Sequence, residues 1–493
     1  MRQVFVCATT VSAIAAVAFG QTTRPQPAPY TSKEIRLGSV DEVKGWIPSQ
    51  QHIAVYVRRG QKSHVIVDGN AGPEYDQILG GAFTSDGKHL AYAATNGPES
   101  FVVVDGSQRF NYDGIFGGSL VLSSDAKRVA WTVRKGEKWV VEVDGKPSPE
   151  YDGFFEKSLV FSPDGTHVAY VWSQSDGLHL VLDGHATQGY EEGGAPVFSP
   201  DGKHIAYEAA VVWGKDARVF LDGQPSDSYV YADTPVFSPD GRRLAYGAAL
   251  VKGMWRMFVD GHAGGYYERV GTPLFSPDSK RFIYVVNKGR KSGVVLDGQP
   301  GLAYDGIRFG TLIFSPDSKR VTYAAYKDSK CLVLVDGQAC DELDGIDDGC
   351  PTFSPDGAHL VYAGQKGSKS MVIVDGTVGP AYDQINSPPI FSPGGKHLAY
   401  TASVDGKSVV VLDGVEGPKY DAIDSTPLFS PDGHHLACAV KLGRQQFVVV
   451  DGQAGAAYAD ILDGSPIFRP DGTLEYAAEK QGSIYYVECN FPR

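Results

Sequence analysis

The chain has 493 residues, of which 42% are hydrophobic, and a formal net charge of −13 from 45 basic and 58 acidic side chains. This length allows several ordinary domains or one long array, and the hydrophobic content is that of a packed soluble protein. The acidic balance argues against nucleic acid or an anionic membrane surface as the main partner and is compatible with basic partners.

The first twenty residues have the pattern of a secretory signal peptide. Arg2 provides a positive start, and the apolar run from Val4 to Ala18 is short for a membrane span. We expect residues 1–20 to be removed, which makes the mature protein periplasmic or secreted, without a transmembrane segment; a retained anchor is the alternative. Residues 21–33 contain three prolines and are expected to form an extended leader.

Two short phrases alternate along the rest of the chain. The first is Phe-Ser-Pro-Asp-Gly, as in residues 161–165, followed by basic residues and an apolar run that ends in Tyr. The second is a run of Val, Leu or Phe before Asp-Gly, as in residues 67–69. Successive Asp-Gly pairs lie 37 to 39 residues apart, a period that is typical of repeat architectures.

Each repeat contains the signals of four antiparallel strands. In one copy, the β-prone residues 234–238 precede a Pro-Asp-Gly turn, and residues 243–246 begin a second strand. Residues 256–259 form a third strand, and Asp260-Gly261 is a strong hairpin signal before a fourth strand.

A single sheet of this kind would leave both apolar faces in water, so the sheets must stack. Stacking in a closed ring covers every face, which predicts an all-β protein of the β-propeller class. A solenoid of parallel coils is disfavoured because Asp-Gly hairpins require antiparallel pairs.

We count twelve repeat units in residues 34–493. Twelve exceeds the usual number of blades, so two tandem six-bladed rings, divided near 265–272, are weakly preferred over one large ring. Residues 33–37 resemble a fourth strand without its first three, and the last repeat lacks a fourth strand. We therefore predict that this N-terminal strand completes the last blade and closes the ring.

Cysteine is sparse, so disulfides are not expected to hold the fold together. Cys340 and Cys350 flank one loop and could pair, whereas Cys438 replaces the Tyr of the repeat and should be a buried thiol. The spacing of Cys and His resembles no zinc site, and we predict neither a metal nor another cofactor.

The phrase Phe-Ser-Pro-Asp-Gly-Lys-His-Leu-Ala-Tyr resembles the WD-repeat-like propeller family typified by the periplasmic protein TolB. The resemblance covers roughly residues 40–490 and implies a propeller that offers its faces and channel to partners. Similar blades occur in prolyl-oligopeptidase-type enzymes. This chain lacks both the N-terminal domain of TolB and a Gly-x-Ser-x-Gly elbow, so neither a Tol partner nor peptidase activity carries over.

The repeated Asp and His residues are interpreted as structural. Asp before Gly hydrogen-bonds its own backbone in turns, and a site used once would not recur in every blade. His89 and its counterparts share a position that Arg243 fills elsewhere, which a metal ligand would not tolerate.

Blades three to six depart from the common pattern and carry our candidate binding site. Four Trp residues lie near the hairpins between the second and third strands, with basic residues and extra Tyr beside them, a composition typical of binding hot spots. Packing of these Trp between blades is the competing interpretation. The candidate residues are Trp139, Trp172, Trp213, Trp255, Lys215, Arg218, Arg256, Tyr231 and Tyr267.

Two functions follow. The first is a non-catalytic module that binds a protein or peptide on a propeller face, which the uniform repeats and the lack of a recognisable catalytic constellation favour. The second is an enzyme, a hydrolase or lyase, or a carbohydrate-binding protein that uses the channel mouth. The short loops leave little material for a pocket, so the interaction module is preferred.

Overall fold

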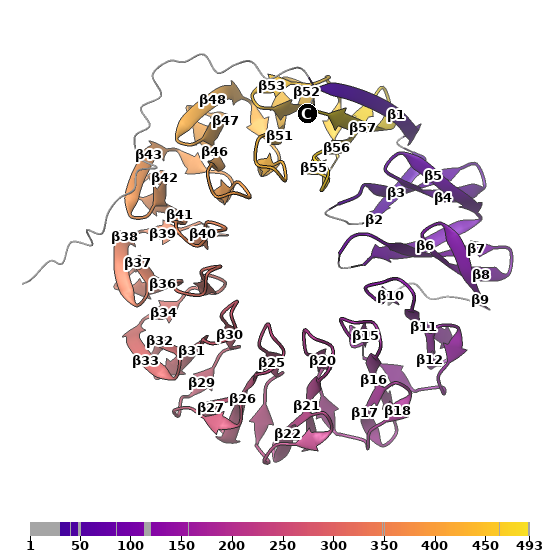
Figure 1. Ribbon diagram of the computed structural model, residues 1–493, viewed down its shortest axis with the longest axis vertical. Helices are drawn as coiled ribbons and strands as arrows, with labels where there is room; N and C mark the ends of the chain where they lie inside the picture. Colours follow the sequence, from indigo (N-terminus) through magenta and orange to yellow (C-terminus); the bar gives the residue numbers. More distant parts are fainter. Residues whose placement is uncertain are drawn as a thin grey trace, which may run out of the picture.

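The computed structural model describes residues 30–39, 41–47, 51–84, 86–112, 120–155, 157–347, 349, 351–462 and 464–491. In this part of the chain the strands form twelve antiparallel sheets, and there is no helix. Figure 1 shows the sheets side by side around one wide opening, so the predicted all-β propeller of twelve units is confirmed. The blades, numbered 1 to 12, span residues 43–75, 77–112, 121–147, 153–186, 192–225, 231–263, 269–304, 306–343, 345–382, 384–420, 422–454, and 460–490 together with 31–39.

Each blade has four rows of strand, and the first row is interrupted in most blades. In blade 6, β24 (Tyr231–Ala232) and β25 (Val236–Phe237) both pair with β26 (Leu244–Val251). β27 (Met254–Val259) and β28 (His262–Ala263) complete the sheet. In Figure 1 the interrupted first rows lie toward the opening and the fourth rows lie at the outer rim.

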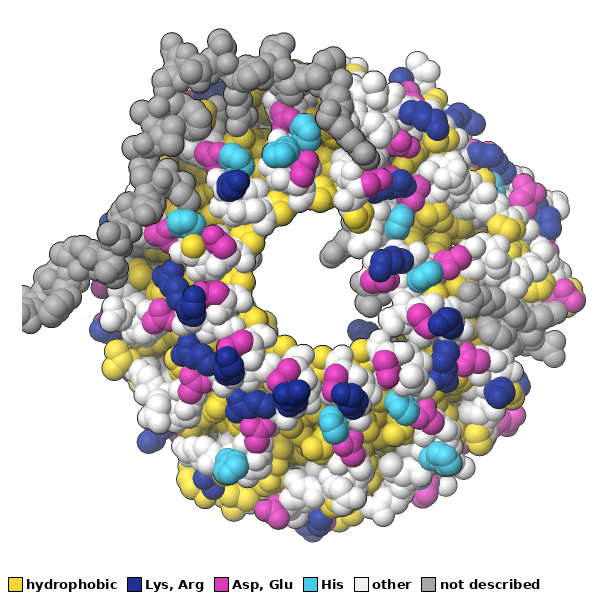
Figure 2. Space-filling model, viewed as in Figure 1, with side chains coloured by type: hydrophobic (Ala, Val, Ile, Leu, Met, Phe, Trp, Pro, Cys, Tyr) yellow, Lys and Arg dark blue, Asp and Glu magenta, His cyan; other side chains and the backbone are white. Residues whose placement is uncertain are grey.

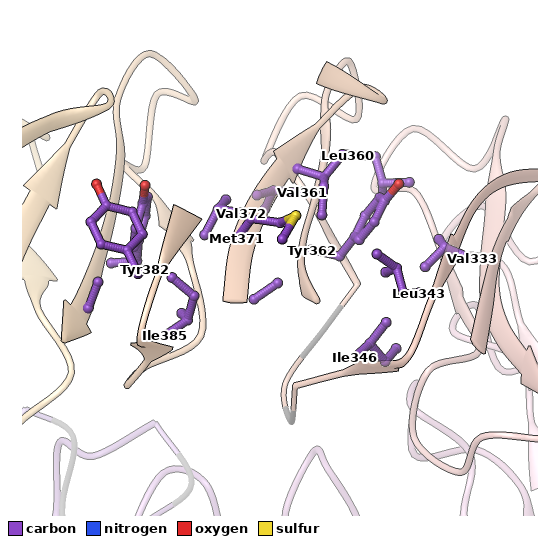
Figure 3. Packing of buried hydrophobic residues seen from close by; sticks show 14 of the residues in the cluster. Val333, Leu343, Ile346, Leu360, Val361, Tyr362, Met371, Val372, Tyr382 and Ile385 are labelled. Atoms are coloured by element: carbon purple, nitrogen blue, oxygen red, sulfur yellow. The ribbon is translucent and has the colours of Figure 1, made fainter. Parts of the chain in front are cut away.

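Neighbouring blades bury one another. Figure 3 shows Tyr362 of blade 9 beside Leu343 of blade 8, and Tyr382 of blade 9 facing Ile385 of blade 10. These four side chains belong to one buried cluster that runs across three blades. Because burial of a large apolar side chain contributes about 1.5–3 kcal/mol, a blade without neighbours would lose most of its stabilisation.

The ring is closed by the N-terminal strand, as predicted. β1 (Thr31–Ser39) pairs antiparallel with β57 (Ser483–Asn490), from Thr31 opposite Asn490 to Ser39 opposite Ser483. The strand therefore begins inside the segment 21–33 that the sequence assigns to the leader. β1 supplies the fourth row of blade 12 and covers the edge that the last repeat would otherwise expose.

The preference for two six-bladed rings was wrong, because the twelve blades form one ring (Figure 1). Residues 265–272 join two blades that pack like any other pair. Trp255 of blade 6 and Tyr284 of blade 7 share one buried cluster, and the Glu268 carboxylate accepts a hydrogen bond from the Gly289 N–H at 2.9 Å. Blade 6 thus packs against blade 7 with the face that a six-bladed ring would need for closure against blade 1.

Three sequence predictions lie outside the described residues, namely the signal peptide at 1–20, most of the leader, and a Cys340–Cys350 pair, since Cys350 is not described. Cys438 is buried, as predicted. Across the described residues, no helical segment has the length and apolar character that a membrane crossing requires.

Candidate functional site

The ring has two faces with different turns. The turns between first and second strands and the Asp-Gly turns between third and fourth strands lie on one face, which we call the Asp-Gly face. The hairpins between second and third strands lie on the other, which we call the hairpin face. Figure 2 shows the Asp-Gly face, where acidic, basic and His side chains alternate around the opening.

The Asp residues of the Asp-Gly face hold each blade together, which confirms their structural interpretation. Asp105 has a positive φ of 50°, as its hairpin turn requires, and its Oδ1 accepts a hydrogen bond from the Leu90 N–H at 3.0 Å. Its Oδ2 lies 2.7 Å from His89 Nδ1. Where Arg replaces His, Arg243 donates to Asp260 at 2.9 Å and also to the Lys280 carbonyl of the next blade at 2.8 Å.

The Asp of the Phe-Ser-Pro-Asp-Gly phrase caps its own turn in the same way. Asp164 Oδ1 accepts hydrogen bonds from the Ser162 hydroxyl at 2.5 Å and from the Thr166 N–H at 3.1 Å. The Ser162 hydrogen bond is the main reason that the pKa of Asp164 falls to about 2. These carboxylates are therefore engaged in the fold.

On the hairpin face, an acid that follows the fourth strand ties each of seven blades to the next. Its carboxylate accepts a hydrogen bond from a backbone N–H in the following blade's hairpin. We call this contact the acid latch. It links Asp76 to Gly97, Glu191 to Trp213, Glu268 to Gly289, Asp305 to Asp328, Asp344 to Gly367, Asp383 to Asp405 and Asp421 to Gly443. Between blades 5 and 6 the acid is replaced by Val230, so this junction has no such latch.

The four candidate Trp residues do not form one exposed patch. Trp172 is only 6% exposed and is stacked between Tyr151, at 4.0 Å between ring centroids, and His179, at 4.3 Å. Trp255 is 7% exposed, and Trp139 is half-buried. Only Trp213 is largely exposed, at 57%. The competing interpretation, packing between blades, holds for Trp172 and Trp255, which are buried on strands, whereas Trp213 lies in a hairpin.

The remaining candidates divide between two places. Tyr231 lies beside Trp213 and Trp255, whereas Tyr267 is bridged through its backbone to Trp255. Lys215 is exposed on the hairpin of Trp213, and Arg218 on the following strand pairs with Asp216 at 2.8 Å. Arg256 lies over the Tyr266 ring, at 4.4 Å to its centroid, and donates a hydrogen bond to the Gly264 carbonyl. Both contacts are with the segment that directly follows blade 6.

A cavity of about 380 Å³ opens at the junction of blades 5 and 6. Its aromatic wall is a ladder: Trp213 meets Tyr231 edge-on at 5.5 Å, and Tyr231 stacks on Trp255 at 6.4 Å. Arg269 covers the Trp255 ring at 5.1 Å from its centroid. The charged lining residues are Glu192, Glu208, Asp233, Lys252 and Arg269.

Glu208 is the most unusual charged residue in this cavity. It follows the second-strand Tyr, where other blades carry small residues such as Ala93 and Ala363. Thr234 donates a hydrogen bond to its Oε1 at 3.3 Å, and its Oε2 is buried with no hydrogen-bond partner among the described residues. Burial raises the pKa of Glu208 to about 7, and burial also raises the pKa of Asp233 against the opposing charge of Arg269.

A second cavity of about 720 Å³ adjoins the first and shares Asp233 and Arg269 with it. It lies along the first strands of blades 5 to 7. In blade 8, Thr311 at the break in the first row accepts a hydrogen bond from the Ala324 N–H at 2.9 Å. The corresponding segments of blades 5 to 7 place a Pro after this position, in Gly194-Ala195-Pro196, Asp233-Thr234-Pro235 and Gly271-Thr272-Pro273.

The raised pKa of Glu208 makes a prediction about stability. A carboxyl whose folded pKa lies above its unfolded value of 4.5 stabilises the fold fully below pH 4.5 and loses that contribution as pH rises through about 7. Between pH 5 and 8 we expect the wild-type free energy of unfolding to fall by about 2–3 kcal/mol more than that of Glu208→Gln. Urea denaturation of both proteins at several pH values measures this difference, and parallel curves would contradict it.

Sequence reasoning missed Glu208, Asp233 and Arg269, although a signal existed. At the first-strand position where several blades have Gly, as at Gly306 and Gly345, three successive blades carry Glu192, Tyr231 and Arg269. Other blades carry Gln77, Gln384, Ala422 or Asp460 there, so the signal is the run of three large or charged side chains in successive blades.

The strand pairing and the closed ring define the chain as a twelve-bladed β-propeller. No protein-family model matches it, and no curated protein matches it in sequence. Solved structures with similarity include a eukaryotic initiation factor, at 14% identity and a TM-score of 0.37, covering 69% of this chain and 98% of the other.

Two further solved structures share similarity with the chain. TolB from Acinetobacter baumannii has 15% identity and a TM-score of 0.24, covering 65% of this chain and 79% of TolB. Hydrazine synthase from Kuenenia stuttgartiensis has 13% identity and a TM-score of 0.26, covering 52% of this chain and 95% of the other.

Proposed function

We propose that this propeller is a non-catalytic interaction module that binds a protein segment on its hairpin face at blades 5 and 6. The observation that carries the proposal is a group of exposed apolar side chains on two adjacent hairpins. We call it the apolar hairpin patch, and it consists of Val212, Trp213, Leu250, Val251 and Met254.

The patch is specific to these two blades. Trp213 is 57% and Val251 is 50% exposed. Most other hairpins carry polar or charged residues at the same place, as in residues 135–138 and 366–369. Clustered apolar side chains on a soluble surface mark interaction sites, and an exposed Trp is a frequent hot spot.

The charged residues beside the patch indicate which kind of protein segment would bind there. The cavity that adjoins Trp213 has three carboxylates, on Glu192, Glu208 and Asp233, against two cations, on Lys252 and Arg269. The chain as a whole carries a net charge of −13. A segment with apolar side chains for the patch and a basic side chain for the cavity complements both features.

The location of this activity is part of the proposal. A secreted or periplasmic site follows from the signal-peptide pattern of residues 1–20. It agrees with the resemblance of the repeated phrase to that of TolB, which is a periplasmic protein.

A carbohydrate-binding or hydrolytic role at the cavity is the second candidate. A carboxyl with a pKa of about 7 in a cavity with other carboxylates is the kind of group that serves as a general acid. The geometry favours it less, because Glu208 Oε2 is buried and Oε1 accepts the Thr234 hydroxyl.

Selection from a random peptide display library tests the proposed function. We expect wild-type protein to enrich peptides that combine apolar and basic residues. Their affinity should fall at least about tenfold for the variant Trp213→Ser/Val251→Ser/Met254→Ser, because truncation of a hot spot typically costs more than 1 kcal/mol.

Leu442 offers a matched control. It ends the second strand of blade 11, corresponds in position to Val251, and is 53% exposed. Leu442→Ser should leave peptide affinity unchanged. Equal affinity of the wild type and the triple variant would refute the patch, and hydrolysis of a glycan by the wild type but not by Glu208→Gln would favour the second candidate.

A further inference from the structure

Most blade junctions are filled by a pair of Tyr rings. One ring comes from the second strand of a blade and the other from the fourth strand of the preceding blade. The hydroxyls of Tyr151 and Tyr170 lie 3.2 Å apart, and those of Tyr229 and Tyr246 lie 3.3 Å apart. Ring pairs of the same kind, edge to face, occur at Tyr75–Tyr92, Tyr382–Tyr400 and Tyr458–Tyr476.

At three junctions the second-strand ring reaches a glycine of the preceding blade. A Cβ added at Gly72 would lie 3.6 Å from the Tyr92 hydroxyl, and one at Gly264 would lie 3.0 Å from that of Tyr284. At Gly455 the nearest second-strand hydroxyl is that of Tyr476, at 3.8 Å. The phenol ring therefore fills a defined space between adjacent blades.

The junction of blades 10 and 11 lacks this ring. Cys438 occupies the second-strand position, while Tyr420 remains on the fourth strand of blade 10. A cavity of about 370 Å³ lies at this place and is lined by Gly417, Tyr420 and Cys438.

The cavity is mainly apolar and reaches the surface, and Asp413, Glu416 and Asp451 also line it. Its walls include Val410, Leu412 and Val449, and its margin includes Val415, which is exposed. Burial raises the pKa of the Cys438 thiol to about 12, so the thiol lines the cavity as a neutral group. An apolar cavity of about 150 Å³ is known to hold benzene, so this cavity has room for a substituted ring.

We propose that the cavity between blades 10 and 11 binds a small para-substituted phenol in the place that a Tyr ring fills at other junctions. The ring packs on Tyr420 and the apolar walls, as the second-strand Tyr does elsewhere. Its hydroxyl lies toward Gly417 and Tyr420, where it makes the hydrogen bond that pairs Tyr151 with Tyr170. This site is on a different part of the ring from the apolar hairpin patch and does not depend on it.

Titration of the full mature chain with p-cresol, followed by calorimetry or ligand-observed NMR, tests the proposal. We expect a dissociation constant on the order of 0.1–1 mM, as for a small ring in an apolar cavity. Toluene, which lacks the hydroxyl, should bind about fivefold more weakly. Equal affinity for both compounds, or no binding of p-cresol, would overturn the assignment to phenols.

The variant Cys438→Tyr restores the ring that the other junctions have. It should bind p-cresol at least about tenfold more weakly than wild type, whereas Cys438→Ala keeps the cavity and should retain binding. Unchanged binding by Cys438→Tyr would place the ligand elsewhere and refute the site.

A crystallographic measurement covers the case in which Cys438→Tyr does not fold. Wild-type crystals soaked in 4-bromophenol should show the anomalous bromine signal between Tyr420 and Cys438. A signal only at other positions would overturn the proposal.

Discussion

Replacement of Arg469 with Met is expected to lower the free energy of unfolding by about 3–5 kcal/mol at pH 8. Arg469 replaces the Ser of the repeated phrase in blade 12 and joins that blade to blade 1. Its guanidinium contacts Asp68 of blade 1 at 2.7 Å and also pairs with the fully buried Glu475. Tyr486 donates to the same Glu475 carboxylate at 2.6 Å. Without Arg469, the Glu475 carboxylate is left buried without a cation.

The expected loss depends on pH, and this provides a check. Burial already raises the pKa of Glu475 to about 7, and removal of Arg469 raises this pKa further. The variant can then relieve the buried charge by protonation at low pH, so its destabilisation should be smaller at pH 5.5 than at pH 8. Chemical denaturation at the two pH values measures this.

A double variant separates the ion pair from packing. Arg469→Met/Glu475→Leu removes both charges and should recover much of the stability that Arg469→Met loses, because an apolar pair replaces a buried ion pair at little cost. If the single variant were as stable as wild type, the closure of the ring would not depend on this network.

Trp172→Ala and Trp213→Ala are expected to have opposite consequences. Trp172 is buried between two rings, so its removal leaves a cavity and should cost about 3–5 kcal/mol. Trp213 has most of its side chain in solvent, so its removal should change stability by less than about 0.5 kcal/mol. Thermal and urea denaturation of the two variants test this difference.

The same pair separates stability from binding. Trp213→Ala should lose affinity for selected peptides while it unfolds like the wild type. Comparable destabilisation by the two substitutions would show that Trp213 is part of the core, which would remove the central residue of the apolar hairpin patch.

The blades and their turns could be predicted because the information is local. Asp before Gly prefers a turn with positive φ, and Asp105 and its counterparts have it. The closing strand could also be predicted, because residues 33–37 lacked a sheet and the last repeat lacked an edge. These inferences need only the order of residues within one repeat.

The number of rings could not be predicted in this way. It depends on the small rotation between adjacent blades, which the combined volumes of side chains at every junction determine. Neither the length of the repeat nor the order of strands within it reveals the total rotation around the ring. Large side-chain pairs such as Tyr229–Tyr246 recur around the ring. They are compatible with a small rotation angle from each blade to the next, and therefore with one wide ring.

The candidate site was partly predictable. Blades 5 and 6 differed visibly from the repeat at Val230, Tyr231 and Trp213, and the structure brings Tyr231 and Trp213 together at the cavity. Burial of Trp172 could have been inferred, because it lies two residues after Tyr170 and shares its side of the strand. The role of Glu208 required the three-dimensional contact with Thr234 of the next blade.

The pairing of β1 with β57 places both ends of the described chain on blade 12. In Figure 1 this blade lies across the opening from blades 5 and 6. A label, surface linkage or fused domain attached at Tyr30 would therefore lie on the side of the ring opposite blades 5 and 6, the blades of the apolar hairpin patch. Immobilising the molecule by that end leaves the opposite rim unobstructed, which is a practical advantage for every binding assay described above.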